Sequence, residues 1–115
     1  MLQGKVWGST ETLFKNAFIE IHHILIKPNS YCSMHCHQWK SNAFYVKTGV
    51  LFIDVRKNDY KLTDTTILGA GDFTVVKPLE YHCFRTTDTP VDAIEIYFPQ
   101  ELGEDIIRET VGGAN

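Results

Sequence analysis

The sequence has 115 residues, of which 43% are hydrophobic and 12% aromatic, and its 11 Lys and Arg against 14 Asp and Glu give a formal net charge of −3. A chain of this length is expected to form one domain over residues 1–115 and to bury roughly two-thirds of its unfolded surface around a single core. The charges are spread along the sequence without a basic run that could neutralise phosphates, which argues against nucleic acid as a partner.

No window approaches the roughly 20 apolar residues of a membrane span, and the start of the chain lacks the pattern of a signal peptide. We therefore expect a cytoplasmic protein without a membrane partner. Cys32, Cys36 and Cys83 are too few for a disulfide scaffold and are expected to be free thiols.

Short strands separated by turns are predicted along most of the chain. The expected strands are residues 18–27, 31–37, 42–47, 50–55, 73–76, 82–86 and 91–98. Thr48-Gly49 and the runs at 57–59 and 69–72 supply the turn signals. Many short strands in a chain too short for crossover helices indicate an all-β antiparallel sandwich or barrel.

The end of the chain departs from this pattern. Residues 101–111 offer Ile106 and Ile107 for a buried side and pair Glu104 with Arg108 at i, i+4, and two glycines follow. We predict a short C-terminal helix over these residues.

Three histidines form the strongest candidate for a metal site. His35 and His37 lie two positions apart in a predicted strand, so their side chains project to the same face, about 7 Å apart along the strand. Cys36 then points the other way, and Cys32 shares its parity if the strand is regular. Two imidazoles can converge on one ion when further ligands arrive from other strands, and His82 is the candidate third ligand.

The spacing of these histidines resembles the first motif of the cupin family, which runs Gly, five residues, HxH, three or four residues, Glu, six residues, Gly. His35, His37 and Gly49 match this motif, while Asn29 stands at the first glycine and Asn42 at the glutamate. The second cupin motif is similarly recognisable at Gly71, Asp72, Pro78 and His82. The resemblance implies a single-domain cupin, a double-stranded β-helix or jelly-roll barrel, that holds a divalent metal ion (Zn, Mn, Fe or Ni). It also implies a homodimer, because edge strands of a small barrel need cover.

A closer resemblance covers nearly the whole chain. Residues 6–9 (VWGS), 26–28 (IKP), 94–96 (IEI) and 102–106 (LGEDI) are similar, in order and position, to the isomerase domain of type II mannose-6-phosphate isomerases. That domain is a metal-dependent cupin that interconverts mannose 6-phosphate and fructose 6-phosphate. The resemblance implies metal-assisted isomerisation of a sugar or sugar phosphate, with a carbohydrate as the small-molecule ligand.

Two residues near the histidines receive roles from the same resemblance. Asn42 stands where the family has a metal-binding glutamate, and it is interpreted either as a weak fourth ligand or as an amide that positions a histidine. Lys40 is the nearest cation for a sugar phosphate.

Glu95 is the candidate proton shuttle. In its predicted strand Glu95 shares one face with Ala93 and Tyr97, and if that face lines the barrel, its apolar walls would raise the pKa of the carboxyl toward neutrality. On the outer face Glu95 would be an ordinary solvated charge. Glu80 and Tyr81 flank the second motif and are candidate substrate contacts at the barrel mouth, with solvated loop residues as the alternative.

Two other functions stay open. The chain could be a non-catalytic cupin that binds a small metabolite, since a fold does not guarantee chemistry. It could also carry a three-histidine iron site that resembles the site of thiol dioxygenase cupins. The identity of the metal would discriminate between these functions.

Overall fold

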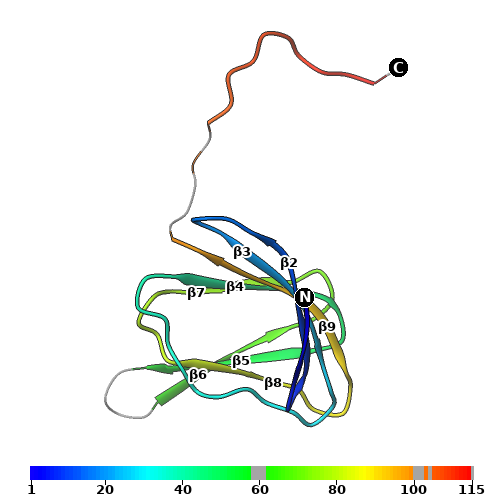
Figure 1. The fold of residues 1–115 in the computed structure, drawn as a ribbon, viewed down its shortest axis with the longest axis vertical. Helices are drawn as coiled ribbons and strands as arrows, with labels where there is room; N and C mark the ends of the chain where they lie inside the picture. The colour runs from blue at the N-terminus through cyan, green and yellow to red at the C-terminus, as the bar shows by residue number, and fades with distance from the viewer. Residues whose placement is uncertain (58–61, 100–102, 104, 115) are drawn as a thin grey trace.

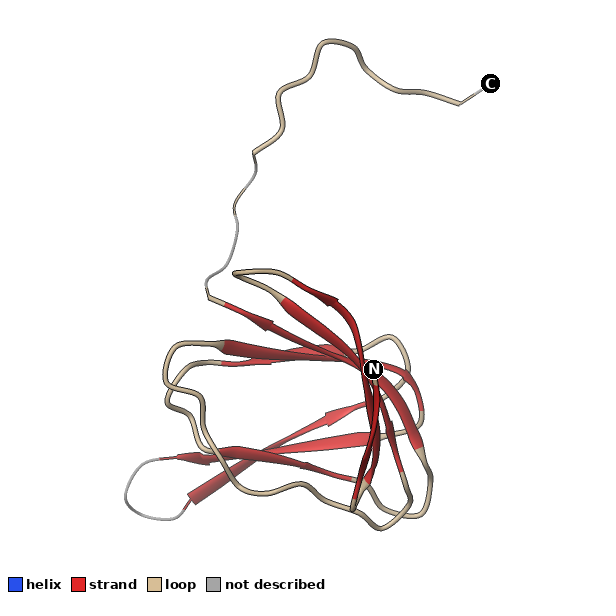
Figure 2. Cartoon of the chain, viewed as in Figure 1, coloured by secondary structure: helices blue, strands red, loops and turns tan. Residues whose placement is uncertain are grey.

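The computed structural model of the chain describes residues 1–57, 62–99, 103 and 105–114. These residues form strands and loops and no helix (Figures 1 and 2). The strands are β1 (Leu2–Lys5), β2 (Gly8–Lys15), β3 (Glu20–Ile26), β4 (Ser41–Thr48), β5 (Leu51–Lys57), β6 (Leu62–Leu68), β7 (Phe73–Val76), β8 (His82–Arg85) and β9 (Val91–Phe98).

The strands form two antiparallel sheets that face one another across the core (Figure 1). The larger sheet has the order β1-β2-β3-β9-β4-β7 and the smaller sheet has the order β6-β5-β8. The last strand, β9, lies between β3 and β4 and pairs with both, although these two strands belong to the first half of the chain. The predicted all-β jelly-roll fold is confirmed.

Inward-facing side chains change from apolar to polar along the barrel axis. At one end the alternation of β3, β4, β5, β8 and β9 buries a hydrophobic core, and Phe44 of the larger sheet meets Phe84 of the smaller with ring centroids 6.1 Å apart. Toward the other end the inward positions of β3, β4, β8 and β9 carry polar groups. The core residues are Ile24, Ile26, Cys32, Phe44, Val46, Leu51, Ile53, Leu68, Val76, Phe84, Val91 and Ala93. The apolar end holds the strands together, and the polar end provides the titratable side chains of the candidate site.

Most predicted strands occur with small changes in their bounds, and 73–76 and 91–98 coincide with β7 and β9. The predicted strand 31–37 is wrong in part, because this segment makes only isolated bridges, Tyr31 with Arg85 and His35 with His82. β1, β2 and β6 were not predicted, since they are edge or near-edge strands with mostly exposed, polar residues. Asn58 and Asp59 of the predicted hairpin turn lie outside the described residues, but β5 and β6 do pair as an antiparallel hairpin.

The predicted C-terminal helix is not seen. The described part of that segment, 103 and 105–111, is non-helical and leads away from the barrel, as the orange and red trace in Figure 1 shows. Ile106 and Ile107 are 66% and 98% exposed, so no packed surface supports a helix through them. A lone helix of this length is marginal in water, and an i, i+4 ion pair contributes only about 0.3–0.5 kcal/mol.

No helix in the described ranges is both long enough and apolar enough to cross a membrane.

Candidate metal centre

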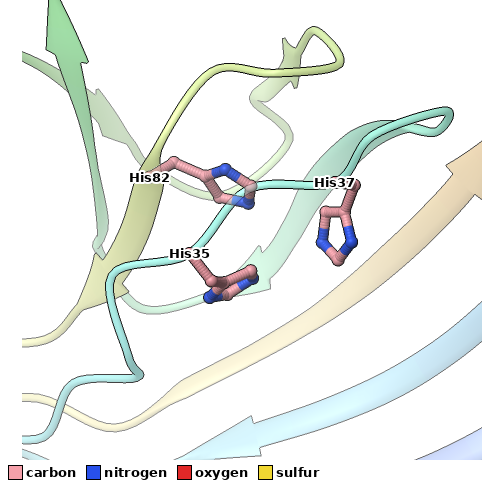
Figure 3. Close-up of side chains that lie close together, drawn as sticks. All are labelled: His35, His37 and His82. Atoms are coloured by element: carbon pink, nitrogen blue, oxygen red, sulfur yellow. The ribbon is translucent and has the colours of Figure 1, made fainter.

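His35, His37 and His82 come together at the polar end of the barrel (Figure 3). One ligand nitrogen from each ring lies within 4.8 Å of the other two. The ring centroids are 4.7 Å apart for His35 and His82, 5.1 Å for His35 and His37, and 5.6 Å for His37 and His82. The structure thus gathers the three histidines that the sequence analysis selected as ligands.

Backbone hydrogen bonds hold the loop of His35 and His37 against the start of β8. The amide of His35 donates to the carbonyl of His82 over 3.0 Å, and the amide of His82 donates back to His35 over 2.8 Å. The amide of Leu79 donates to the carbonyl of His37, and its φ of 67° turns the chain just before β8. The antiparallel approach of His82 to the histidine pair therefore exists, although the pair lies in a loop and not in a regular strand.

The ring orientations favour Nε2 as the ligand atom. Nδ1 of His35 donates to the carbonyl of Ser33 over 2.7 Å, and Nδ1 of His82 donates to the carbonyl of Glu80 over 2.9 Å. Such contacts fix the tautomer and direct the other nitrogen at a metal. Burial lowers the pKa of His37 and of His82, so both rings favour the neutral form that a metal requires.

Two observations show that the cluster fits a divalent cation. Nε2 of His37 is buried and finds no hydrogen-bond partner among the described residues. Nε2 of His82 lies 3.1 Å from Oδ1 of Asn42, and because Nδ1 of this neutral ring carries the proton, both facing atoms are acceptors. A cation in the cluster would interact favourably with Nε2 of His37 and with the two facing acceptors of His82 and Asn42. Three imidazoles with an open position suit Zn, Fe, Ni or related ions.

Asn42 links the cluster to a buried carboxylate. It is 1% exposed, its Oδ1 faces His82, and its Nδ2 donates to Oε2 of Glu95 over 3.3 Å. Both interpretations of Asn42, as a weak fourth ligand and as an amide that positions a histidine, stay predictions.

Glu95 points into the barrel, which strand alternation alone could not decide. It is 9% exposed and receives hydrogen bonds from Asn42 and Tyr97. Burial raises the pKa of Glu95, although these two hydrogen bonds act in the opposite sense. Burial also raises the pKa of Tyr97, whose phenol therefore remains a hydrogen-bond donor, and its ring meets His37 edge-on at 5.0 Å.

One cavity of about 420 Å³ contains the histidine pair and Glu95. Lys40 lies on its wall, 3.6 Å from Glu20 and 5.5 Å from the centre of the Tyr97 ring. The lining residues are Gln3, Lys5, Trp7, Thr10, Glu20, His22, Cys32, Ser33, His35, His37, Lys40, Phe84, Glu95 and Tyr97. The cavity thus combines metal ligands, a buried acid and cationic groups.

The side chains of Glu80 and Tyr81 are not among those lining residues. Glu80 accepts hydrogen bonds from the Lys77 amide and the Lys57 ammonium, and Tyr81 packs under Arg56, 4.8 Å from the guanidinium carbon. The structure gives no support for contact of either side chain with a substrate in this cavity. Glu80 acts on the site through its backbone carbonyl, which orients His82.

His22 and Glu20 also line the cavity and were not predicted from the sequence. The His22 imidazole contacts a side chain at each nitrogen. Its Nδ1 lies 3.2 Å from Oγ1 of Thr12, and its Nε2 lies 3.0 Å from Oε2 of Glu20. A usable signal existed, because His22 has the same strand parity as the buried Ile24. His23 faces outward and meets Asp92 instead.

Cys32 also lines the cavity, against the expectation from strand parity, because the segment 31–37 is not a regular strand. Its Sγ accepts a hydrogen bond from the Phe84 amide over 3.2 Å, and burial raises its pKa to about 12. Cys32 is not part of the cluster of ligand atoms that His35, His37 and His82 form.

Comparisons with known proteins identify the fold. The sequence model of the family described as "Cupin domain" matches residues 22–97, which include all three histidines. KdgF from Halomonas sp. superposes with a TM-score of 0.73 at 13% identity, covering 88% of this chain and 89% of that chain. An RmlC-like cupin from Shewanella frigidimarina superposes with a TM-score of 0.72 at 20% identity, covering 87% and 84%. Oxalate decarboxylase from Bacillus subtilis superposes with a TM-score of 0.75 at 10% identity, covering 86% of this chain and 27% of that chain. No curated protein matches in sequence.

Proposed function

This chain belongs to the cupin domain family, and on that premise we propose that it is a metal-dependent enzyme that isomerises a small sugar or sugar phosphate. One observation carries the proposal: three histidines have converging ligand nitrogens, and two of them, His35 and His37, line the same cavity as a buried carboxylate. The resemblance to mannose-6-phosphate isomerases supplies the carbohydrate as substrate class.

The metal would be held by His35, His37 and His82. When bound, a divalent ion supplies Lewis-acid stabilisation of the negative charge that develops on the carbonyl and neighbouring hydroxyl oxygens of the substrate. The hydrogen bonds that the His35 and His82 rings donate to the carbonyl oxygens of Ser33 and Glu80 keep these ligands oriented.

Glu95 would move the proton. Its carboxylate would take a proton from the carbon next to the carbonyl and return it to the carbonyl carbon. The hydroxyl proton passes to the former carbonyl oxygen, so that the carbonyl and hydroxyl exchange places. Burial raises the pKa of this carboxyl, and a base whose pKa approaches the working pH is the more effective proton shuttle. Asn42 and Tyr97 fix the position of the carboxylate by donating hydrogen bonds to it.

The cationic side of the cavity would bind the phosphate. Lys40 and Lys5 lie on its wall, while Glu20 balances part of the Lys40 charge. The volume of about 420 Å³ falls in the range of about 300–1,000 Å³ that is usual for small-molecule sites.

Metal content and proton exchange test the proposal together. We expect near-stoichiometric divalent metal in the purified protein and its loss in the His35→Ala, His37→Ala double variant. His23→Ala, on the outer face of β3, is the matched control and should keep the metal. The loaded protein should exchange the proton next to the carbonyl of a sugar phosphate with D₂O, followed by NMR.

Glu95→Gln should reduce this exchange by about 10²–10⁴-fold when assayed with saturating metal, as expected for loss of a general base. Metal-loaded protein that exchanges no proton in any sugar or sugar phosphate would contradict isomerisation. A protein that takes up no metal after reconstitution would contradict the enzyme and leave a small-metabolite binder.

A second candidate is an iron-dependent oxygenase of the thiol dioxygenase type. It is favoured by the cluster itself, which among the described residues consists of three histidines without a carboxylate within ligand distance. Native iron together with O₂ uptake in the presence of a small thiol would support this candidate over the isomerase.

A further inference from the structure

The ligand cluster is electrically neutral, yet a buried acid lies close behind it. Asn42 stands on β4 where the cupin motif has glutamate, so the three imidazoles have no charged partner at that position. Glu95 on the neighbouring strand β9 is buried and touches the Nδ2 of Asn42. A divalent ion in a poorly solvated site is stabilised strongly by a nearby negative charge.

The pairing of β4 with β9 creates this arrangement. Asn42 is the register partner of Tyr97, and Phe44 is the register partner of Glu95, so the Asn42 and Glu95 side chains are diagonal neighbours on the inner face. Their contact thus depends on which strands pair and could not arise from spacing along either strand alone.

The two cavity carboxylates differ in their existing partners. Glu20 lies 3.4 Å from Lys15, 3.6 Å from Lys40 and 3.0 Å from His22. Within the described residues, no Lys or Arg pairs with Glu95, whose hydrogen-bond donors are a neutral amide and a phenol. Glu95 is therefore the cavity acid whose charge is free to balance a cation.

The Asn42 amide is oriented to connect this charge to the cluster. Its carbonyl oxygen faces Nε2 of His82 at 3.1 Å, and its amino group faces the Glu95 carboxylate at 3.3 Å. The negative end of the amide dipole thus points toward the histidines, and the positive end is stabilised by the carboxylate. Such outer partners commonly tune metal affinity 10–100-fold.

We propose that Glu95, acting through Asn42, supplies the counter-charge of this metal centre, so that a carboxylate on β9 replaces the one absent from β4. This inference rests on the proposed metal site but not on isomerisation. In it Glu95 and Asn42 are positioning residues for the ion, whether or not Glu95 also transfers a proton.

Zinc affinity of the purified full chain, measured by competition with a chromophoric chelator and without substrate, tests the inference. Glu95→Gln keeps the shape and removes the charge, and we expect about 10–100-fold weaker binding. Asn42→Leu keeps the acid and removes the connection, and should weaken binding by a similar factor. Glu20→Gln, the matched cavity control, should change affinity by less than about 3-fold, because its charge already has cationic partners.

A charge relocation separates this role from a purely structural one. The double variant Asn42→Glu, Glu95→Gln returns the carboxylate to β4, and its zinc affinity should recover to within about 3-fold of the wild type or exceed it. Metal-free Glu95→Gln should unfold at the same or a higher urea concentration than the wild type, because it no longer buries an ionisable acid.

Each outcome has one meaning. Wild-type zinc affinity in Glu95→Gln overturns the inference and leaves the histidine site intact. If Glu95→Gln weakens zinc binding while Asn42→Leu keeps the wild-type zinc affinity, Glu95 does not act through the Asn42 amide. Absence of binding in the wild type, with Mn²⁺ and Fe²⁺ as well as Zn²⁺, overturns the proposed function and the inference with it.

Discussion

Each ligand histidine is positioned by what its other atoms contact. Carbonyl oxygens accept hydrogen bonds from Nδ1 of His35 and of His82, and the rings of Tyr97 and His37 pack edge to face. The result is a set of rings held toward one point by neutral partners. At the residue scale, the cluster therefore fits a cation and is unfavourable for protonated imidazoles.

This preference predicts how the stability of the metal-free protein depends on pH. Burial lowers the pKa of His37 and His82 below the ordinary value of 6.5, so below that pH the unfolded chain binds more protons than the folded chain. Their contribution is fully present above about pH 6.5 and is lost as the pH falls through the lowered pKa values. Glu95, whose pKa is raised by burial, acts in the opposite sense at pH values above its ordinary pKa of 4.5.

The histidine contribution can be isolated with His37→Gln, His82→Gln. We expect urea unfolding of the wild type, measured with a chelator at pH 7.5 and pH 5.5, to lose more free energy on acidification than the double variant loses. Equal losses in the two proteins would show that these histidines are not the groups responsible.

At the scale of elements, β9 organises the molecule. Its inner face carries Ala93 in the core, then Glu95 and Tyr97 in the cavity, and it pairs with β3 on one side and β4 on the other. The strand therefore joins the apolar and polar ends of the barrel. The turn between β4 and β5 lies against the start of β9, where a Cβ on Gly49 would come 2.3 Å from the Pro90 carbonyl oxygen.

Two glycines of similar backbone conformation give a matched test of that contact. Gly49 has a φ of 90° and Gly71 a φ of 87°, but a Cβ on Gly71 would meet open space. Alanine at either position carries a backbone cost of about 1–2 kcal/mol. Only Gly49→Ala adds a clash with backbone, so its loss of unfolding free energy should exceed that of Gly71→Ala by about 1 kcal/mol or more. Urea denaturation midpoints measure both, and equal losses would contradict the close approach.

At the scale of the whole molecule, a compact barrel carries an extended end. The radius of gyration is 16.3 Å, against about 13 Å for a compact domain of this length, and the longest dimension is 51 Å. Ile107 and Val111 are 98% and 90% exposed in the extended segment (Figure 1). The homodimer expected from the family resemblance stays a prediction that sedimentation velocity would check.

The extended end should not contribute to the barrel or to the cluster. Removing residues 105–115 is expected to leave the thermal unfolding midpoint within about 2 °C of the full chain and the zinc affinity unchanged, since its described residues are exposed and none belongs to the core. A substantially lower midpoint at the same protein concentration would instead indicate that this segment packs on a barrel in solution.

The sequence by itself determined the fold class, most of the strands and the three histidines of the cluster. Strand alternation places Glu95 on the same face as the buried Ala93. Motif spacing identified His35 and His37, which converge from a loop. The edge strands could not be predicted in the same way, because their exposed residues carry little apolar pattern.

Only the tertiary structure decided which groups meet. The contact between Asn42 and Glu95 follows from the pairing of β4 with β9, and His22 enters the cavity because β3 pairs with β9 on the other side. Tertiary contacts also turn Glu80 away from the cavity and bring Cys32 into its wall. Strand periodicity gives the face of a side chain, whereas its neighbours depend on pairing between segments distant in the chain, which local pattern does not encode.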